Sequence, residues 1–401
     1  MKKSIQLSIA MALMMGATAG INAVAPSTAS AEISDKFRLE VNGVTGYVFN
    51  DKQLGGDYQT GAEGVGSSYW NSYTRLQLQY HLDKNVMLQA RLHSGYDDIV
   101  KNVSNSNTSG AFFDQSYLQF RDRKANITYT LGKKGAYLGQ GLIHNSTGNL
   151  TGGQISFGNW YDPTCLQLIY GNKKNGSNFF AANFTHNIMK PWQLSLTYIN
   201  HDTKWNSDYK YDQNGKRWNT NYQELHLLSV GSKIKAKGFT VQGEFVRNMS
   251  DVVRNGTTHT SYSGAYELNK KTGAIEYNNK AKTYNNTYSD RRSDTRRAWY
   301  IEVFTGPTSD MTSGLPLQKP GTNVWSLKYQ DVGANAVDSH NTTFYDDARG
   351  WRLNYGHTFR KGLAADIAIA RMKDKGGSDY NDKHNGEWKT CVVAEVSYKF
   401  R

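Results

Sequence analysis

The residues of this sequence whose chemistry is easiest to interpret are basic side chains placed one position away from apolar ones. Arg75 precedes Leu76, and Arg91 lies between Ala90 and Leu92. An alternation with a period of two places the polar members of a run on one face of a β-strand. The basic residues predicted on such faces are Arg75, Arg91, Lys328, Arg352 and Lys389. If these faces enclose a common interior, their positive charges would favour anions there.

Acidic side chains fall on the same predicted faces. They are Glu40, Glu244, Glu302, Asp366 and Glu395. The expected lining is therefore of mixed charge, and a weak preference for anions rests on the excess of bases in the chain and on the segment described next.

That segment, residues 132–151, is rich in glycine and contains no Asp or Glu. It carries Lys133, Lys134 and His144. Glycine suits a loop that packs tightly against a wall, because no Cβ keeps the two backbones apart. A loop packed in this way against the inner wall of a barrel would place these three side chains at a constriction; the alternative is an ordinary external loop with solvated lysines.

The elements that must position these residues are β-strands. Sixteen segments carry the alternation, near residues 36–49, 69–82, 86–96, 111–123, 125–131, 152–158, 163–171, 178–187, 191–205, 220–236, 238–250, 296–306, 322–331, 348–360, 362–374 and 386–400. Tight turns such as 83–85 alternate with long polar segments such as 50–68. This pattern is typical of a transmembrane antiparallel β-barrel with short periplasmic turns and long external loops. A β-propeller would instead repeat every 40–50 residues or so.

The number of strands is open at two places. Within 250–295, residues 266–268 and 274–277 flank a turn and form either a hairpin inside a loop or two more spanning strands, which would make eighteen. The connection 307–321 is long for a periplasmic turn. An even number is expected in either case, and sixteen strands are enough to leave an aqueous channel.

The N-terminus predicts export. Lys2 and Lys3 precede a mostly apolar run, and the small residues of 29–31 follow it, which is the order of a secretory signal peptide. We therefore expect a signal peptide over 1–31 and a single barrel domain over 32–401, located in the bacterial outer membrane. The mature chain lacks the run of roughly 20 apolar residues that a membrane helix needs.

Charge and cysteine content exclude several other classes. The formal net charge is +13, but the bases are dispersed along an exported chain, which favours anionic lipid or solutes over nucleic acid as partners. Cys165 and Cys391 fall on strands far apart around a barrel, so no disulfide is expected. No catalytic, metal-binding or cofactor motif is recognisable, and we expect neither enzymatic activity nor a cofactor.

The last predicted strand, 394–400, ends in an aromatic residue and resembles the final strand of bacterial outer-membrane porins. Segments 114–120 and 131–143 are similar to the porins of diderm Firmicutes, and the resemblance extends over essentially the whole mature chain. It implies a homotrimer in contact with outer-membrane lipid and lipopolysaccharide, and an inward fold for the loop after the fifth strand. Arg401 departs from the pattern, because porins usually stop at the terminal aromatic residue.

These observations favour a water-filled channel for passive diffusion of small hydrophilic solutes and ions, with a weak anion preference. Two alternatives stay open. One is a substrate-specific anion channel in which the interior arginines bind the solute. The other is a surface adhesion or structural barrel that binds through 250–295.

Overall fold

The computed structural model describes most of the chain after the N-terminal segment. The described residues are 36–50, 69–96, 111–159, 162–173, 177–204, 210–211, 217–218, 222–250, 258–268, 275–285, 296–306, 308–309, 311–333, 336–338, 344–345, 348–375 and 386–400. The predicted signal peptide, 1–31, lies outside them.

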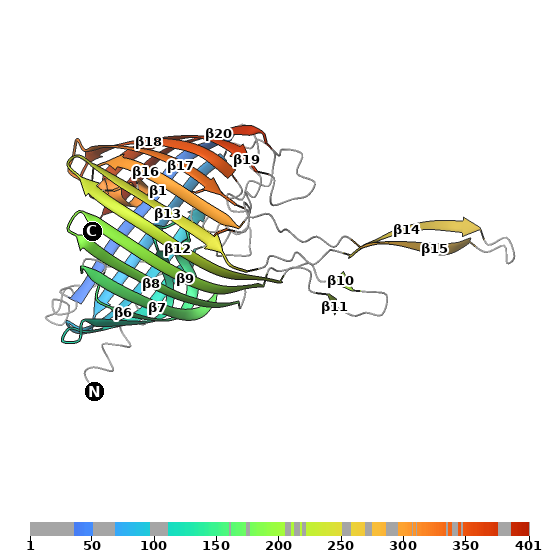
Figure 1. Cartoon of the computed structure of the whole chain (residues 1–401), viewed down its shortest axis with the longest axis horizontal. Coiled ribbons are helices and arrows are strands. Elements are labelled where there is room, and N and C mark those ends of the chain that lie inside the picture. The colour runs from blue at the N-terminus through green and yellow to red at the C-terminus, as the bar shows by residue number, and fades with distance from the viewer. Residues whose placement is uncertain are drawn as a thin grey trace, which may run out of the picture.

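Sixteen antiparallel strands form one closed barrel, in which each strand pairs with its neighbours in the chain and the last pairs with the first (Figure 1). The strands are β1 (Phe37–Asn50), β2 (Tyr69–His81), β3 (Val86–Tyr96), β4 (Phe112–Asp122), β5 (Ile127–Leu138), β6 (His144–Phe157), β7 (Thr164–Lys173), β8 (Asn178–Met189), β9 (Trp192–Lys204), β12 (Tyr222–Ala236), β13 (Phe239–Asn248), β16 (Arg297–Thr305), β17 (Asn323–Val332), β18 (Ala348–Arg360), β19 (Leu363–Asp374) and β20 (Trp388–Phe400). The predicted all-β, sixteen-stranded barrel is confirmed.

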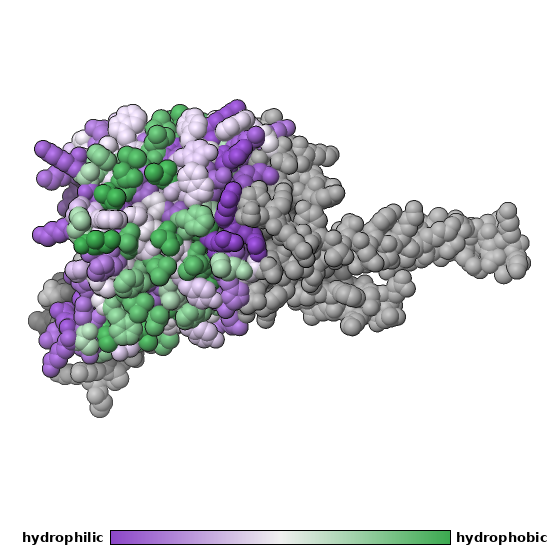
Figure 2. Space-filling model, viewed as in Figure 1, coloured by the Kyte–Doolittle hydropathy of each residue, from purple (hydrophilic) through white to green (hydrophobic). Residues whose placement is uncertain are grey.

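The alternation along each strand separates two surfaces. In β17, Trp325 and Leu327 are 51% and 53% exposed and point outward, whereas Ser326 and Lys328 are buried and point inward. The same pattern runs around the barrel, so the outside carries a broad apolar band between hydrophilic ends (Figure 2). Because exposed apolar area of this extent is unfavourable in water, the outer surface matches a lipid environment.

The two ambiguous connections add no strands to the barrel. Strands β14 (Thr258–Leu268) and β15 (Ile275–Asn285) form a separate two-stranded sheet, as do β10 (Lys210–Tyr211) and β11 (Arg217–Trp218). The connection after β16 contains the short helices α4 (Met311–Gly314) and η2 (Leu315–Leu317), and Leu315 packs against inward-facing Val324 and Ala364. The count is therefore sixteen and not eighteen. Among the described residues, no helix has both the length and the apolar character needed to cross a bilayer.

The prediction was wrong about the bounds of the fifth and sixth strands. Most of 132–151 is not a loop, because β5 continues to Leu138 and β6 already begins at His144. The pairing shifts register between Lys134 and Ala136, and Gly132 has a φ of +129°, which is strained for any other residue. Beyond this bulge the hairpin no longer divides lipid from water, so its sequence loses the alternation on which the prediction depended.

Both cysteines are free, as the sequence predicted, and both are buried.

Candidate pore and constriction

The turn between β5 and β6, residues 139–143, is held against the inner wall of the barrel by Glu244 of β13. The Oε2 atom of Glu244 accepts hydrogen bonds from the backbone N–H groups of Gln140, at 2.9 Å, and Leu142, at 2.8 Å. Gly139 has a φ of +61°, and a Cβ there would lie 2.0 Å from Oε1 of Glu244. A glycine is therefore required at 139 both by its backbone conformation and by the closeness of the carboxylate.

Strands on either side of β13 contact the same turn. The Asn183 side chain on β8 accepts a hydrogen bond from the Gly139 N–H at 3.0 Å, and Ser195 on β9 bonds the Gln140 amide at 3.3 Å. The Tyr300 hydroxyl on β16 donates to the Gln140 carbonyl oxygen at 2.6 Å. Because these partners are inward-facing and come from four strands, the turn lies inside the barrel.

Apolar side chains fill the space between the hairpin and this wall. Leu138, Leu142 and Ile143 are at most 1% exposed. The same cluster takes in inward-facing residues of the surrounding strands, among them Ile169, Phe179, Ile199, Leu227, Val246, Ala298, Tyr300 and Val332. One side of the interior, from β7 to β17, is thus packed like a protein core.

A buried group of charges joins the hairpin to the connection between β17 and β18. Asp338 of this connection bonds Nδ1 of His144 and Nδ1 of His201, both at 2.9 Å, and Nζ of Lys173 at 2.5 Å. The backbone N–H of Asp338 also donates to the Ile143 carbonyl oxygen at 3.2 Å. Burial alone would raise the pKa of the Asp338 carboxyl, but Lys173 and the two histidines hold it well below its usual range.

The described residues of the same connection contact two apolar clusters of the interior. Phe344 joins the apolar cluster around the hairpin, and Tyr345 joins a second cluster formed by β1, β18, β19 and β20. Gln330 fixes Tyr345 through both of its backbone groups, at 2.6 and 3.3 Å. Two segments of the chain, the hairpin and this connection, therefore narrow the interior together.

The remaining wall, β2 to β4, is polar. Arg91 forms a bidentate ion pair with Asp114, with contacts of 2.7 to 3.1 Å, and Arg75 donates to Nδ1 of His93 at 2.9 Å. Arg75 also lies 4.3 Å from the centre of the Tyr73 ring and 3.7 Å from Asp114. Carboxamides continue this wall, because Gln79, Gln89 and Gln115 are linked by hydrogen bonds of 2.7 Å.

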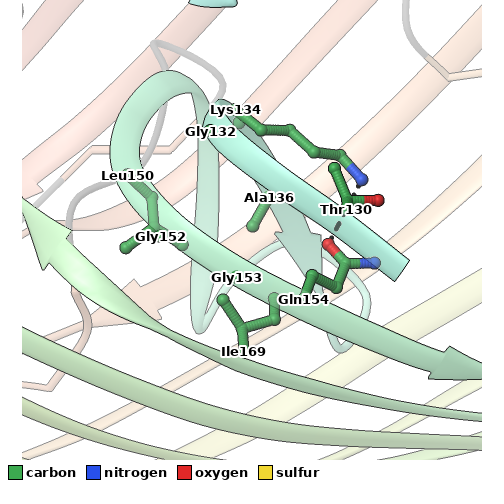
Figure 3. Close-up of a pocket in the computed structure, with 10 residues that line it drawn as sticks. Thr130, Gly132, Lys134, Ala136, Leu150, Gly152, Gly153, Gln154 and Ile169 are labelled. Carbon is green, nitrogen blue, oxygen red and sulfur yellow. Dashed lines mark hydrogen bonds between the residues drawn. The ribbon is translucent and has the colours of Figure 1, made fainter. Parts of the chain in front are cut away.

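The two lysines predicted at the constriction point in opposite directions. Lys134 faces inward, where it donates to Gln154 at 3.2 Å and lies 5.7 Å from the Tyr117 ring (Figure 3). Lys133 shares the outward face with Leu131 and bonds the Phe113 carbonyl oxygen at 2.8 Å. Consecutive residues of a strand point to opposite faces, so the two lysines do not line the same surface, and a role of Lys133 at the constriction stays a prediction.

The other predicted residues do not form one site. Arg75 and Arg91 lie together on the polar wall, whereas His144 lies in the Asp338 group. Lys328 is 4.0 Å from the Phe344 ring centre, in the connection between β17 and β18, and 4.0 Å from Glu302. Arg352 donates to Asn354 at 2.8 Å on β18.

Sequence reasoning missed two acids, Asp114 and Asp338. Asp114 is the unpaired residue of a β-bulge on β4. An alternation that is counted through the bulge therefore assigns Asp114 to the wrong face of the strand. Asp338 belongs to a connection without strand pattern, and its partners lie far away in the sequence. Among the described residues, no group of three or more His, Cys, Asp and Glu side chains has the arrangement of a metal site.

Comparisons with known proteins show a likeness of fold to solved porin structures. No protein-family model matches the chain, and no curated protein matches it in sequence. The solved structure of Salmonella typhi OmpF in complex with daunomycin matches with a TM-score of 0.50 and 10% identity, covering 91% of this chain and 97% of that one. A triple mutant of the Rhodopseudomonas blastica porin matches with a TM-score of 0.48 and 10% identity, covering 91% and 100%. The likeness is one of fold. The narrower similarity to porins of diderm Firmicutes stays a prediction.

Removing the Glu244 carboxylate should free the turn. In Glu244→Ala, two buried N–H groups lose their acceptor, which costs about 1–3 kcal/mol for each group. We expect the amides of Gln140 and Leu142 to exchange hydrogen about 10- to 100-fold faster, with a smaller effect in Glu244→Gln, which keeps one acceptor oxygen. Hydrogen-exchange mass spectrometry measures this, and Glu40→Ala on β1 is the control. Unchanged protection at 140–142 would refute the anchor.

Asp338→Asn should destabilise the barrel, because it leaves Lys173 and two histidines buried around a neutral group. The expected loss is about 3–5 kcal/mol, against less than about 1 kcal/mol for Asp331→Asn, whose pair with Lys375 is more exposed. The pKa of Asp338 is lowered on folding, so its contribution is present above the unfolded value of about 3.9 and lost only as pH falls below it. Thermal unfolding from pH 7 to pH 3 measures both variants; a difference already lost at pH 5 contradicts the assignment.

Proposed function

We propose that this protein is an outer-membrane channel for the passive diffusion of small hydrophilic solutes and ions. The observation that carries the proposal is the opposite character of the two barrel surfaces, an apolar band outside and a charged and amide-rich lining inside. A closed barrel with these surfaces leaves no backbone edge in lipid, and sixteen strands give room for water. A passive channel needs no catalytic group.

The proposed path runs along the polar wall, between the Arg75–Arg91–Asp114 group and the hairpin. The other side of the interior is filled by the apolar cluster around Leu142. Toward the turn end of β1 and β2, the wall borders a hollow of about 480 Å³ lined by Arg38, Glu40, Gln77 and Gln79 as well as Phe37 and Leu39. Solutes would therefore pass off the barrel axis.

A weak anion preference is part of the proposal. It is supported by the basic excess of the chain and by Lys134, which faces inward at the base of the hairpin and donates to the Gln154 side-chain oxygen. The interior arginines contribute less to an anion preference than the sequence suggested, because Asp114 is paired with Arg91 and lies near Arg75. This pairing also weighs against the alternative of a dedicated anion-binding track of arginines.

Planar-bilayer recordings test the channel and its selectivity. We expect the purified protein to conduct in potassium chloride, with a reversal potential that favours chloride modestly under a salt gradient. Well-folded protein without conductance would overturn the proposal. A potassium-favouring potential would keep the channel and remove the anion preference.

The two neighbouring lysines provide a matched pair for the constriction. Lys134→Glu should shift the reversal potential toward potassium, because it reverses a charge that faces the path. Lys133→Glu makes the same change on the outward face and should leave the potential unaltered. Equal shifts in both variants, or none in Lys134→Glu, would show that the base of the hairpin does not set selectivity.

We also propose that the protein forms a homotrimer through the outer face around β20, β1 and β2. Small and hydroxyl-bearing residues, including Gly43, Thr45 and Ser72, lie there between exposed apolar residues such as Leu39 and Tyr47. Thr45 and Ser72 hydroxyls lie 3.1 Å apart, and Tyr398 reaches across Gly43 to Thr74, at 2.5 Å. Such a surface suits close protein contact better than lipid.

Bulky substitutions on this face should prevent assembly without closing the channel. We expect Thr45→Trp together with Ser72→Trp to give monomers by light scattering in detergent, while single-channel conduction persists. Leu196→Trp, on the outer face of β9, is the control and should leave the trimer intact. A trimer that survives the double substitution, or wild-type protein that is monomeric, would refute the interface.

A further inference from the structure

One connection at the turn end of the barrel is much longer than the tight turns beside it. Neighbouring strands there are joined through segments such as 190–191, 237–238 and 361–362, whereas β16 and β17 are joined through 306–322. This connection carries α4 and η2, which together we call the turn-end insert (residues 311–317). Two residues are enough to reverse an antiparallel chain, so the additional residues are not required to close the sheet.

The turn-end insert lies against the inner surface of the barrel. The Leu315 side chain is fully buried in an apolar cluster with Met311. The cluster is completed by Val324 and Ala364, which face inward from β17 and β19. The Leu315 carbonyl oxygen also accepts a hydrogen bond from the inward-facing Thr358 hydroxyl at 2.9 Å. Accordingly, α4 packs on β19 and β20, and η2 packs on β18, β19 and β20.

The wall beneath the insert has a shape that receives it. Gly356 faces inward on β18, and a Cβ at this position would lie 2.5 Å from Cδ2 of Leu315 and 3.0 Å from Sδ of Met311. Any side chain at 356 would therefore force Leu315 to move. In the turn between β18 and β19, the Gly362 N–H donates to the Pro316 carbonyl oxygen at 2.9 Å. These contacts give the insert a fixed place on the wall.

The insert leaves one part of the turn end open. Before α4, the Ser309 hydroxyl accepts a hydrogen bond from the Gln242 amide of β13 at 3.4 Å. The connection thus contacts the inner wall at β13 and again at β18 to β20. The next strand after β20 is β1, which lines with β2 the hollow of about 480 Å³ around Arg38 and Gln77. The hollow therefore begins one strand beyond the insert.

We propose that the turn-end insert forms a separate constriction of the channel and limits the size of the solutes that pass the turn end. Gln242, which contacts Ser309, lies nearer the turn end of β13 than Glu244, which holds the hairpin turn. A solute that has passed the hairpin then meets the insert, and the hollow at β1 and β2 provides the way past it. The inference rests on the proposed channel and deepens it, because it assigns size selection to a second segment.

The composition of the insert favours selection by width over selection by charge. Its sequence, Met-Thr-Ser-Gly-Leu-Pro-Leu, contains no charged residue. Pore diameter and the charges along a pore act as separate filters on a solute. We therefore expect the insert to limit solute size while the preference between anions and cations is set by other residues, such as Lys134.

Replacing residues 307–323 by an Asn-Gly turn should widen the turn end. The two-residue turn would join Gly306 to Val324, which continues the observed register of β16 and β17. Two constrictions in series share the resistance of a channel, so single-channel conductance should rise by up to about twofold. The reversal potential should stay unchanged, because the replaced segment carries one Asp and one Lys and hence no net charge.

A milder variant keeps the length of the chain. Met311→Ala together with Leu315→Ala removes the side chains that hold the insert on the wall, and it should change conductance in the same direction by a smaller amount. Leu317→Ala is the matched control, because it truncates an apolar residue of the same insert that is 45% exposed, and it should leave conductance unaltered. Circular dichroism and heat-modifiable migration establish that each variant is folded.

The direct measurement is the largest neutral polyethylene glycol that enters the channel, with the polymer added to one side of a planar bilayer at a time. The protein is inserted from one side only, so that its orientation is known. The inference predicts that both insert variants admit larger polymers from the turn side, while the limit from the loop side stays unchanged because the hairpin still sets it. Unchanged limits in folded variants would overturn the inference. Equal rises on both sides would also overturn it, since the insert would then only support the hairpin.

The same recordings separate this inference from the proposed channel. Conduction by the wild type with unmoved polymer limits in the variants overturns the insert alone. Wild-type protein that does not conduct overturns the passive channel. Conduction gained in that case by replacing 307–323 would still support the insert as the barrier at the turn end, whereas a silent replacement variant would overturn both.

Discussion

Pairing of β20 with β1 is the constraint on which the rest of this structure depends. It gives every strand of the barrel two partners, so that no row of backbone N–H and C=O groups is left open at the surface. Only a closed sheet of this kind can show an apolar exterior to lipid and keep its polar side chains within. All interior chemistry described above follows from that division of the two faces.

Closure creates an interior wider than side chains from the wall can fill, and two segments occupy part of it. The hairpin turn is fixed by Glu244, and the connection after β17 is fixed by Asp338. A buried carboxylate is costly unless it is paired or hydrogen-bonded. Asp338 is paired with Lys173 and bonded to two histidines, and one oxygen of Glu244 accepts two backbone N–H groups of the turn. The two acids therefore determine which part of the interior stays open.

The sequence predicted the strands well because lipid on one side and water on the other impose a strict period of two. The assignment of residues to faces failed in segments that do not have lipid on one side and water on the other. The hairpin beyond Gly132 has protein on both sides, the bulge at Asp114 interrupts the count, and Asp338 lies in a segment without period. Lys133 and Lys134 show the limit most clearly, because neighbouring residues of one type differ completely in what they face.

The Asp338 group joins residues that are distant along the chain, since His144 and Asp338 are 194 positions apart. A change in the length or charge of one interior segment would therefore disrupt its contacts with the other. The loops of a barrel normally diverge independently in sequence. In related sequences the aspartate and its two histidines should be gained and lost as a set. Such coordinated change would distinguish relatives that keep both interior segments from barrels that share only the fold of the strands.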